Sequence, residues 1–511
     1  MSLDEFRKSP WQKSHDLYRK SALSVSPAPE YASSEVILAS LCRTIGFAGT
    51  NERVVPQAGR DLDKKIQRLR ERRMPAGEGA SASADTWNTV LHGVLESPKL
   101  RNQSSKRFLQ VTPVVPATAL FSGSARLSAN SWPAGSMVRR MICLGSRDRK
   151  AAESLWKDLF SALTVGQDDD IFARWLEQET HAWVPGHAWE LASIPDDEPA
   201  LDDDDFSTVG FLPARKFAKD LRAIIQAKDA MTRRQWTSLL EAMLRLAVVA
   251  HVTWLCDVQA RIWQCLSDAL SSNGPVGTEQ VREAIFPARP QYMTYGGKAL
   301  PGLKDGISGY LGARLGINAV LWSLHEAGIP HDADMSSSRG IAALCQQVRD
   351  NHATLSDHGT LQAFLDLRES ESRAMNCKKG IGVNMLEFAR HVLGQRDTAE
   401  PLLRGYDQGY VLKKKGTSTS SPWVVSLGPV AVLALVHCSL AGMSGPRSIH
   451  RLGQHLAAYG IAIDRHEIAA SDLGHQLRML GLVLDSPDAE SGMLLLPPFT
   501  LSQPGKAPTN E

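Results

Sequence analysis

Three side chains in the second half of the chain could take part in acid–base chemistry: Glu387, Glu400 and His437. Glu387 precedes His391 by four residues, a spacing that places both on one face of a helix. A carboxylate beside a buried imidazole, such as that of His437 in its apolar surroundings, can form or orient a general base. Because no nucleophile accompanies the set, an ordinary helix pair with a hydrogen-bonded core histidine is the preferred interpretation, and a metal-independent hydrolase or nuclease is the alternative.

The sequence lacks the motifs of common enzyme classes. It contains no GxxxxGK[ST] phosphate loop and no HExxH, GxSxG or GxGxxG pattern, which argues against an ordinary motor or dinucleotide enzyme. The 15 histidines show no standard metal-ligand spacing, and the seven cysteines form no CxxC pair. We therefore expect no metal and no cofactor. The cysteine pattern and the polar N-terminus, which lacks a secretory signal, favour a reducing cytoplasm.

Residues 445 to 499 have a helical pattern followed by a hairpin pattern. Apolar residues recur at helical spacing from Ile449 to Tyr459, and Gly460 follows as a stop signal. A short second helix containing Ile468 and a third beginning after Ser471 come next, with Leu473, Leu477 and Leu480 on the buried face of the third. Residues 482 to 496 then predict a β-hairpin.

Three helices and a hairpin in so short a segment resemble the winged helix-turn-helix superfamily in architecture. The resemblance implies that the third helix enters the major groove of double-stranded DNA, with His475, Gln476 and Arg478 as base-reading residues. It also implies phosphate contacts from Arg447 and Arg451. Winged helices also dock proteins, and the acidic residues in this segment leave that alternative open.

Charge is unevenly distributed along the chain, although the net value is only +2. Residues 1–150 hold 24 Lys/Arg against 13 Asp/Glu, residues 151–205 hold 2 against 15, and residues 373–451 hold 11 against 4. The acidic stretch is interpreted as a solvated loop between domains, with competition for a nucleic-acid surface as the alternative. The last basic range includes a run that could contact phosphates, namely Lys413, Lys414 and Lys415.

A second basic feature is a predicted helix from Arg60 to Arg73. Its charges could follow a phosphate backbone, although a solvated amphipathic face is the preferred interpretation. The candidate contacts are Arg60, Lys64, Lys65, Arg68 and Arg72.

The elements that must carry these residues are mainly helical. Long helices are predicted over 214–271, with a junction near Met231, and further helices at about 306–328, 339–352, 359–374 and 381–393. Strand-like runs lie within 107–145, the tryptophans of 151–205 are expected in a core, and the apolar run 416–446 predicts a buried helix rather than a membrane span. The predicted division is 1–75 (helical, basic), 76–150 (linker and small mixed α/β region), 151–205 (acidic, Trp-rich), 206–372 (helical core domain), 373–444 (basic helical region), 445–499 (winged helix) and 500–511 (disordered tail).

Taken together, the sequence predicts a mainly α, multi-domain protein with a small mixed α/β N-terminal part and a C-terminal winged helix. Its predicted function is that of a DNA-binding, non-motor accessory subunit in a bacterial multi-protein DNA-handling system, such as phage defence or a mobile element. Double-stranded DNA and other protein subunits are the expected partners, and no membrane is expected. A scaffold whose winged helix binds a protein is the remaining alternative.

Overall fold

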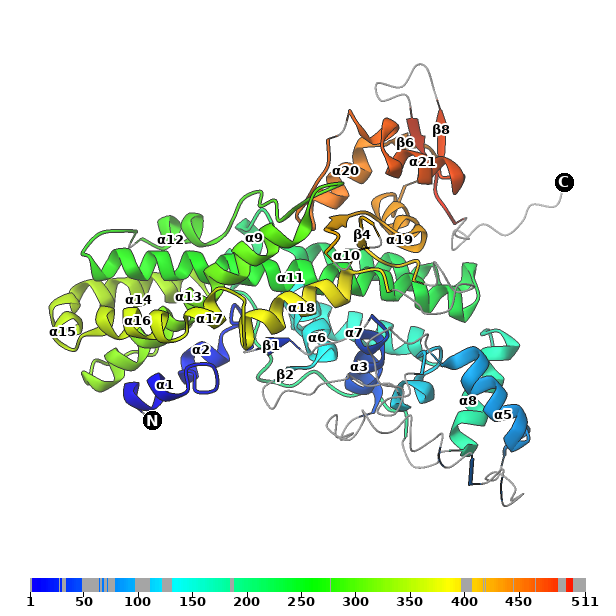
Figure 1. The fold of residues 1–511 in the computed structure, drawn as a ribbon, viewed down its shortest axis with the longest axis horizontal. Helices are drawn as coiled ribbons and strands as arrows, with labels where there is room; N and C mark the ends of the chain where they lie inside the picture. Colours follow the sequence, from blue (N-terminus) through cyan, green and yellow to red (C-terminus); the bar gives the residue numbers. More distant parts are fainter. Residues whose placement is uncertain are drawn as a thin grey trace.

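Helices dominate the fold, with 63% helix against 6% strand, which confirms the predicted mainly α class. Figure 1 shows an elongated body of helices with the C-terminal segment forming a lobe on one side. The computed structural model describes residues 2–26, 28–29, 34–47, 64, 67–68, 71, 79–96, 111–121, 131–183, 188–275, 277–396, 407–416, 418, 420–443, 445–464, 466–485 and 493–499.

The longest element is α11 (Arg233–Leu270), whose 38 residues run along the body (Figure 1). Thr232 begins it with a capping box, because its side chain accepts the Gln235 N–H while the Gln235 side chain accepts the Thr232 N–H. By length and hydropathy α11 could cross a membrane, but 89% of its most apolar window is buried inside the structure. It is therefore placed as a core helix, as its all-round apolar pattern predicts.

A bundle forms around α13 (Ala299–Glu326), which packs along α11. The buried Arg314 of α13 fastens the N-terminal segment to this bundle through Ser14 Oγ at 2.5 Å and Val25 O at 3.0 Å. The predicted helices of this region are confirmed. The bundle elements are α1 (Leu3–Lys8), α2 (Asp16–Lys20), α12 (Thr278–Ile285), α14 (Ser338–Asp350), α15 (His352–Asp357), α16 (Thr360–Ser370), α17 (Ser372–Met375) and α18 (Ile381–Leu393).

The other half of the body is built from α3 (Ser34–Gly46), α6 (Ala134–Gly145), α7 (Arg149–Leu163) and α10 (Pro213–Gln226). The prediction of a strand at 137–145 was wrong, because this run is most of α6. Met137, Val138, Met141 and Ile142 are all fully buried, and their i, i+1, i+4, i+5 spacing makes one helical face toward α3 and α10. In this region strand is limited to β1 (Ala28–Pro29) paired in parallel with β2 (Ser131–Trp132) and the Glu96–Val111 bridge among the described residues.

A smaller cluster of buried residues surrounds α8 (Ile171–Trp183), at the lower right of Figure 1. Trp87 stacks on Trp183 with ring centroids 6.2 Å apart, and Trp156 is buried in the main core. The expectation that the tryptophans of residues 151–205 serve packing is confirmed for Trp156 and Trp183. The elements that complete the cluster are α5 (Ala84–Val90), η1 (Leu91–Leu95) and η2 (Pro116–Phe121).

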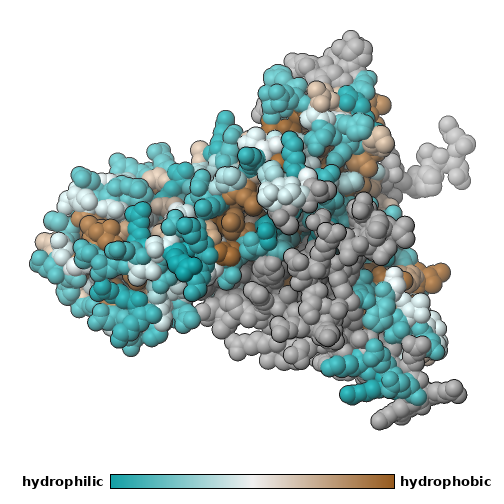
Figure 2. Space-filling model, viewed as in Figure 1, coloured by the Kyte–Doolittle hydropathy of each residue, from teal (hydrophilic) through white to brown (hydrophobic). Residues whose placement is uncertain are grey.

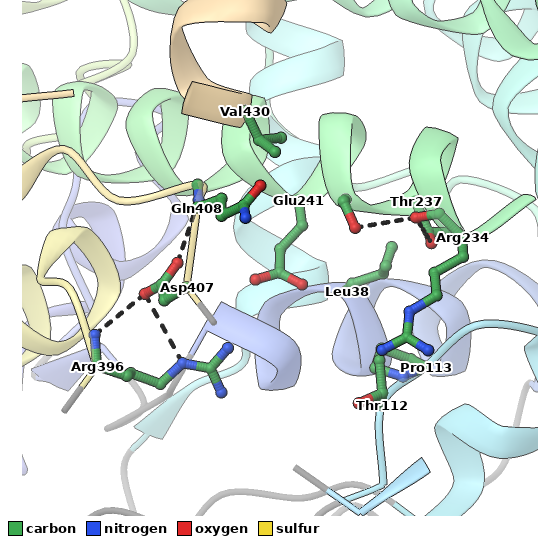
Figure 3. A pocket seen from close by; sticks show the side chains of 12 residues that line it. Leu38, Thr112, Pro113, Arg234, Thr237, Glu241, Arg396, Asp407, Gln408 and Val430 are labelled. Carbon is green, nitrogen blue, oxygen red and sulfur yellow. Dashed lines mark hydrogen bonds and ion pairs between the residues drawn. The ribbon is translucent and has the colours of Figure 1, made fainter. Parts of the chain in front are cut away.

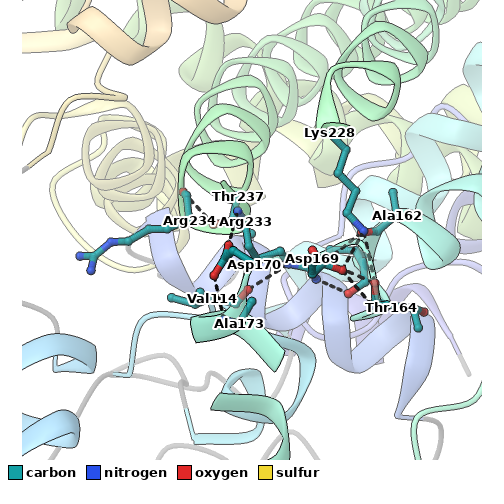
Figure 4. Close-up of polar contacts among 12 residues, drawn as sticks. Val114, Ala162, Thr164, Asp169, Asp170, Ala173, Lys228, Arg233, Arg234 and Thr237 are labelled. Atoms are coloured by element: carbon teal, nitrogen blue, oxygen red, sulfur yellow. Dashed lines mark hydrogen bonds and ion pairs between the residues drawn. The ribbon is translucent and has the colours of Figure 1, made fainter. Parts of the chain in front are cut away.

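The acidic segment is not simply a solvated loop, because two of its carboxylates are buried and form ion pairs with other segments of the chain. Asp169 lies 3.2 Å from Lys228 and 3.4 Å from Arg233 at the start of α11 (Figure 4). Burial alone would raise the pKa of Asp169, but the Gly166 N–H and these two cations hold it below its ordinary value. Asp205, in α9 (Asp203–Thr208), is fully buried against Arg282 at 2.8 Å.

The C-terminal module, residues 445–499, follows α19 (Pro429–Ser439), the buried helix predicted in the apolar run. It contains α20 (His450–Ala457), the short η5 (Ile468–Ala470) and α21 (Asp472–Met479), then β8 (Val483–Asp485) and β9 (Met493–Leu495). Its antiparallel sheet has the order β6–β9–β8, with β6 (Arg447–Ser448) preceding α20. A further strand, β7 (Ile461–Ala462), pairs in parallel with β3 (Met293–Thr294) of the helical body.

Buried side chains of the C-terminal module belong to the same hydrophobic core as those of the helical body. Leu452, Leu456 and Leu477 are fully buried in this core together with residues of α10, α11 and α19. The module is therefore continuous with the helical body through packing as well as through β3–β7 pairing. The remaining elements are η3 (Lys228–Ala230), β4 (Leu412–Lys414) and β5 (Trp423–Val425).

Candidate nucleic-acid interface

Helix α21 presents its predicted outer face to solvent. Ser471 caps it by accepting the Gly474 N–H, and Leu473 and Leu477 anchor its inner face with no exposed surface. On the other side His475 and Arg478 are exposed, and Gln476 is half-buried. This arrangement agrees with the predicted orientation, except that Leu480 lies at the C-cap and is only half-buried.

The guanidinium of Arg478 is already engaged within the module. It lies 3.2 Å from Asp485 of β8 and donates to the Ala469 carbonyl at 3.0 Å. Both members of the ion pair are well exposed, so the pair is open to competition by another anion. A phosphate or base approaching Arg478 would have to displace the Asp485 carboxylate.

The two arginines predicted to contact phosphate differ in orientation. Arg447 on β6 is exposed, whereas Arg451 on α20 is half-buried and donates to the Ser439 carbonyl at 3.4 Å. Arg447 is therefore available to an external phosphate. Arg451 is turned toward the end of α19.

The predicted lysine run lies on a β-hairpin formed by β4 and β5, which we call the lysine hairpin (residues 412–425). Lys413 and Lys415 are exposed and Lys414 is half-buried, as the alternation of side chains along a strand requires. At the base of the hairpin Ser426 donates to Asp472, the first residue of α21, at 3.2 Å. This contact joins the basic hairpin to the N-terminal end of α21.

The distance between the lysines and that contact follows from the strand geometry. The Ser426 N–H donates to the Val411 carbonyl, so Val411 marks the position of the contact along β4. At a rise of about 3.3 Å per residue, Lys413 and Lys415 lie about 7 and 13 Å further along the hairpin. Lys413 and Lys415 thus lie near the N-terminal end of α21, which Asp472 marks.

A buried polar cluster, the Asp220 lock, holds the C-terminal module against α10. Asp220 has no significant exposure and lies 2.7 Å from the Tyr459 hydroxyl, 3.0 Å from His455 Nε2 and 2.9 Å from Lys216 Nζ. Burial alone would raise the pKa of Asp220, but His455, Lys216 and Tyr459 stabilise the carboxylate and hold that pKa below its ordinary value. Sequence reasoning missed this cluster, whose local signals are the four-residue spacings of Lys216 with Asp220 and of His455 with Tyr459.

Of the candidate acid–base residues, the two that the structure describes, Glu387 and His437, make separate contacts. Glu387 contacts its helix neighbours, with His391 at 3.3 Å and a close ion pair to Arg390. His437 donates from Nε2 to the Ala223 carbonyl at 3.0 Å, and burial is the main reason that its pKa is lowered. The i, i+4 pair of Glu387 and His391 is confirmed, and His437 is a hydrogen-bonded core histidine. Glu400 lies outside the described residues.

A cleft of about 260 Å³ opens beside the first turns of α11, next to a buried ion pair (Figure 3). Arg245, fully buried, lies 2.6 Å from Asp407, and the charges of Arg245 and Arg396 hold the pKa of Asp407 below its ordinary value against the effect of burial. Arg234 and Glu241 add opposite charges to the lining, so the cleft has no field of one sign for a phosphate. In the sequence, the sign of the Arg245–Asp407 ion pair is an arginine within the apolar stretch of α11.

No protein-family model matches this chain, and no curated protein sequence matches it. The candidate interface therefore depends on geometry alone. The second basic feature adds little to it, because only Lys64 and Arg68 of its candidate contacts are described, both helical and exposed. The other three, Arg60, Lys65 and Arg72, lie outside the described residues.

Proposed function

We propose that the protein is a DNA-binding, non-motor accessory subunit of a bacterial multi-protein DNA-handling system that acts in the cytoplasm. The observation that carries the proposal is the juxtaposition of α21, with His475 and Arg478 on its exposed face, and the lysine hairpin. The order of helices and strands from α20 to β9 supports a winged helix-turn-helix architecture, in which α21 would enter the major groove. Phage defence and mobile-element systems are settings that use such subunits.

The expected electrostatic footprint is small. Lys413, Lys415 and Arg447 are exposed, and Arg478 becomes available when it leaves Asp485. Three to four phosphate contacts predict that the logarithm of the binding constant falls with the logarithm of salt concentration with a slope of about −3. Binding of this kind is weak at physiological salt, which suits a subunit held in place by partner proteins.

The test is fluorescence anisotropy of a labelled duplex with the full-length chain over a salt series. A chain ending before the C-terminal module is unsuitable, since truncation would expose part of the common core. Lys413→Ala combined with Lys415→Ala should lower the affinity and reduce the salt slope by about 2. The matched control is Lys150→Ala combined with Lys157→Ala, which removes two exposed lysines from α7.

The ion pair of Arg478 gives a second, more specific test. Asp485→Asn removes a negative charge and releases Arg478, so duplex affinity should rise, whereas Arg478→Ala should lower it. Absence of salt-dependent binding by the wild-type chain, or equal effects of the α7 control and the hairpin variant, would refute the proposal.

A protein-docking role is the second candidate, because apolar side chains are exposed on the same module. Met479 at the end of α21 is 74% exposed and Leu484 on β8 is 49% exposed. Figure 2 shows apolar surface on the lobe formed by the C-terminal module, as well as apolar patches within the mostly hydrophilic surface of the bundle. Contiguous exposed apolar surface is typical of protein contact sites, and Met479 and Leu484 lie on the neighbouring elements α21 and β8.

The docking alternative predicts a different pattern of sensitivity. Binding to a co-purifying protein partner should weaken with Met479→Ser combined with Leu484→Ser and should change little with salt. The lysine-hairpin variant should leave that association intact. The opposite pattern, with loss only in the hairpin variant, would favour the DNA interface.

A further inference from the structure

Three histidines from distant parts of the sequence converge at one end of α13. His15 precedes α2, His325 lies in the last turn of α13, and His331 follows that helix. One ring nitrogen from each lies within 4.8 Å of those of the other two. His15 is buried, His331 is half-buried and His325 is exposed, so the cluster is held by the fold on one side and open on the other.

We infer that this histidine cluster (His15, His325 and His331) is a binding site for a divalent metal of the zinc class. Imidazole nitrogen is a preferred ligand of zinc, which is bound through three protein ligands and one open position in many sites. The cluster offers three such donors and an exposed side for a fourth ligand. Mg²⁺ prefers oxygen ligands and is not expected to bind.

The spacing of the donor atoms fits this geometry. His15 Nε2 and His331 Nε2 are 3.4 Å apart. Two nitrogens at the usual zinc–nitrogen distance and tetrahedral angle are about 3.3 to 3.4 Å apart. The two rings therefore stand at the separation that one tetrahedral ion requires.

Hydrogen bonds orient His331 for coordination. His331 Nδ1 lies 2.7 Å from the Ile329 carbonyl, which can only accept, so the proton is on Nδ1 and the lone pair of Nε2 points at His15. A backbone carbonyl on the second ring nitrogen is the common arrangement for metal-bound histidine. Edge contact with Trp322, at 4.7 Å between ring centroids, positions the His15 ring.

His15 also has a role that metal binding would change. Its Nδ1 accepts the Leu17 N–H at 3.3 Å and thereby caps α2, which leaves the proton of the neutral ring on Nε2. Coordination through Nε2 requires that proton to move to Nδ1, so one long cap bond is exchanged for the bond to the metal.

Binding of the metal would cross-link the N-terminal segment to the end of α13. That segment is already attached there, since the Leu3 N–H donates to Glu326 at 2.8 Å and the His15 N–H donates to Asn318 at 2.8 Å. A metal bridging His15 to His325 and His331 would add a link across more than 300 residues of sequence. Amides near His15 should then exchange more slowly with solvent.

The experiment is titration of the metal-free, full-length chain with Zn²⁺, followed by calorimetry and by competition with a chromophoric chelator. One zinc per chain is expected, with Mg²⁺ producing no signal. His325→Ala and His331→Ala, both at positions with exposed surface, should each weaken this site on the order of 100-fold or more. His358→Ala removes an exposed histidine of the same bundle and should leave binding unchanged.

His15→Asn separates coordination from folding. Asparagine is a good N-cap, so this variant should keep the cap of α2 while it removes the imidazole. It should lose zinc and also lose the zinc-dependent protection of residues 15–20 in hydrogen exchange. No zinc bound by the wild-type chain, or equal zinc binding by the wild-type, His325→Ala and His331→Ala proteins, would overturn the assignment.

Discussion

Asp220→Asn should loosen the attachment of the C-terminal module to the helical body. The substitution keeps the shape of the side chain but removes the charge that His455, Tyr459 and Lys216 surround. Breaking a buried ionic contact destabilises a protein by about 3 to 5 kcal/mol. We take about 3 kcal/mol here, because Lys216 keeps some access to water and the asparagine oxygen still accepts one hydrogen bond.

The effect can be read from amide hydrogen exchange of peptides that cover α20. Tryptophan fluorescence is unsuitable, since the last tryptophan is Trp423 and the module itself has none. If the module opens locally, a loss of about 3 kcal/mol raises the exchange rate about 150-fold. Tyr459→Phe removes one hydrogen bond to a charged group and should cost about 1.5 to 3 kcal/mol.

The lock also predicts that these two effects are coupled. The double variant Asp220→Asn with Tyr459→Phe should be less destabilised than the sum of the single variants, because both remove the same contact. Asp158→Asn, at an exposed position on α7, is the matched control and should change nothing. Unchanged exchange of α20 in Asp220→Asn would show that the carboxylate does not hold the module.

Three further substitutions probe the helical body. His251 is fully buried without a hydrogen-bond partner among the described residues, and burial lowers its pKa to about 3. Between about pH 6.5 and pH 3 only the unfolded chain binds a proton at this histidine. The free energy of unfolding should therefore fall on acidification by at most about 1.4 kcal/mol per pH unit. His251→Phe should reduce this pH dependence, measured by urea unfolding. Asp407→Asn should cost about 3 to 5 kcal/mol, because it leaves Arg245 buried without its counter-charge; a loss under 1 kcal/mol would contradict this. Gly340→Ala should lower thermal stability by about 1 to 3 kcal/mol, because the new methyl group would overlap the backbone carbonyl of Asp334.

Local patterns predicted the helices well, because helix signals are short-range. Thr232 and Gln235 begin α11 by a capping box that can be read from four residues, and the apolar faces of α13, α14 and α18 recur at helical spacing. The run at 137–145 was misread as a strand because its valine and isoleucine residues also suit strands. Only its packing against α3 and α10 decided between the two structures.

Tertiary contacts between distant segments could not be predicted in the same way. Asp205 lies in an acidic run that suggests solvent exposure, yet Arg282 and Ser338 bury it completely. The Asp220 lock and the histidine cluster likewise join residues more than 200 positions apart. One sequence without its relatives carries no signal for such pairs, whereas the outer face of α21 follows from helical periodicity alone.

The attachment of the C-terminal module bears on how the protein would act on DNA. A module on a flexible linker would search for DNA independently, but this one shares a core, a strand pair and the Asp220 lock with the helical body. A duplex contacted by α21 and the lysine hairpin would therefore be held in a fixed orientation relative to α10 and α11. Under the proposed function the cationic footprint is small, so this fixed orientation would matter more than affinity, and the chain would serve to position DNA for its proposed partner proteins.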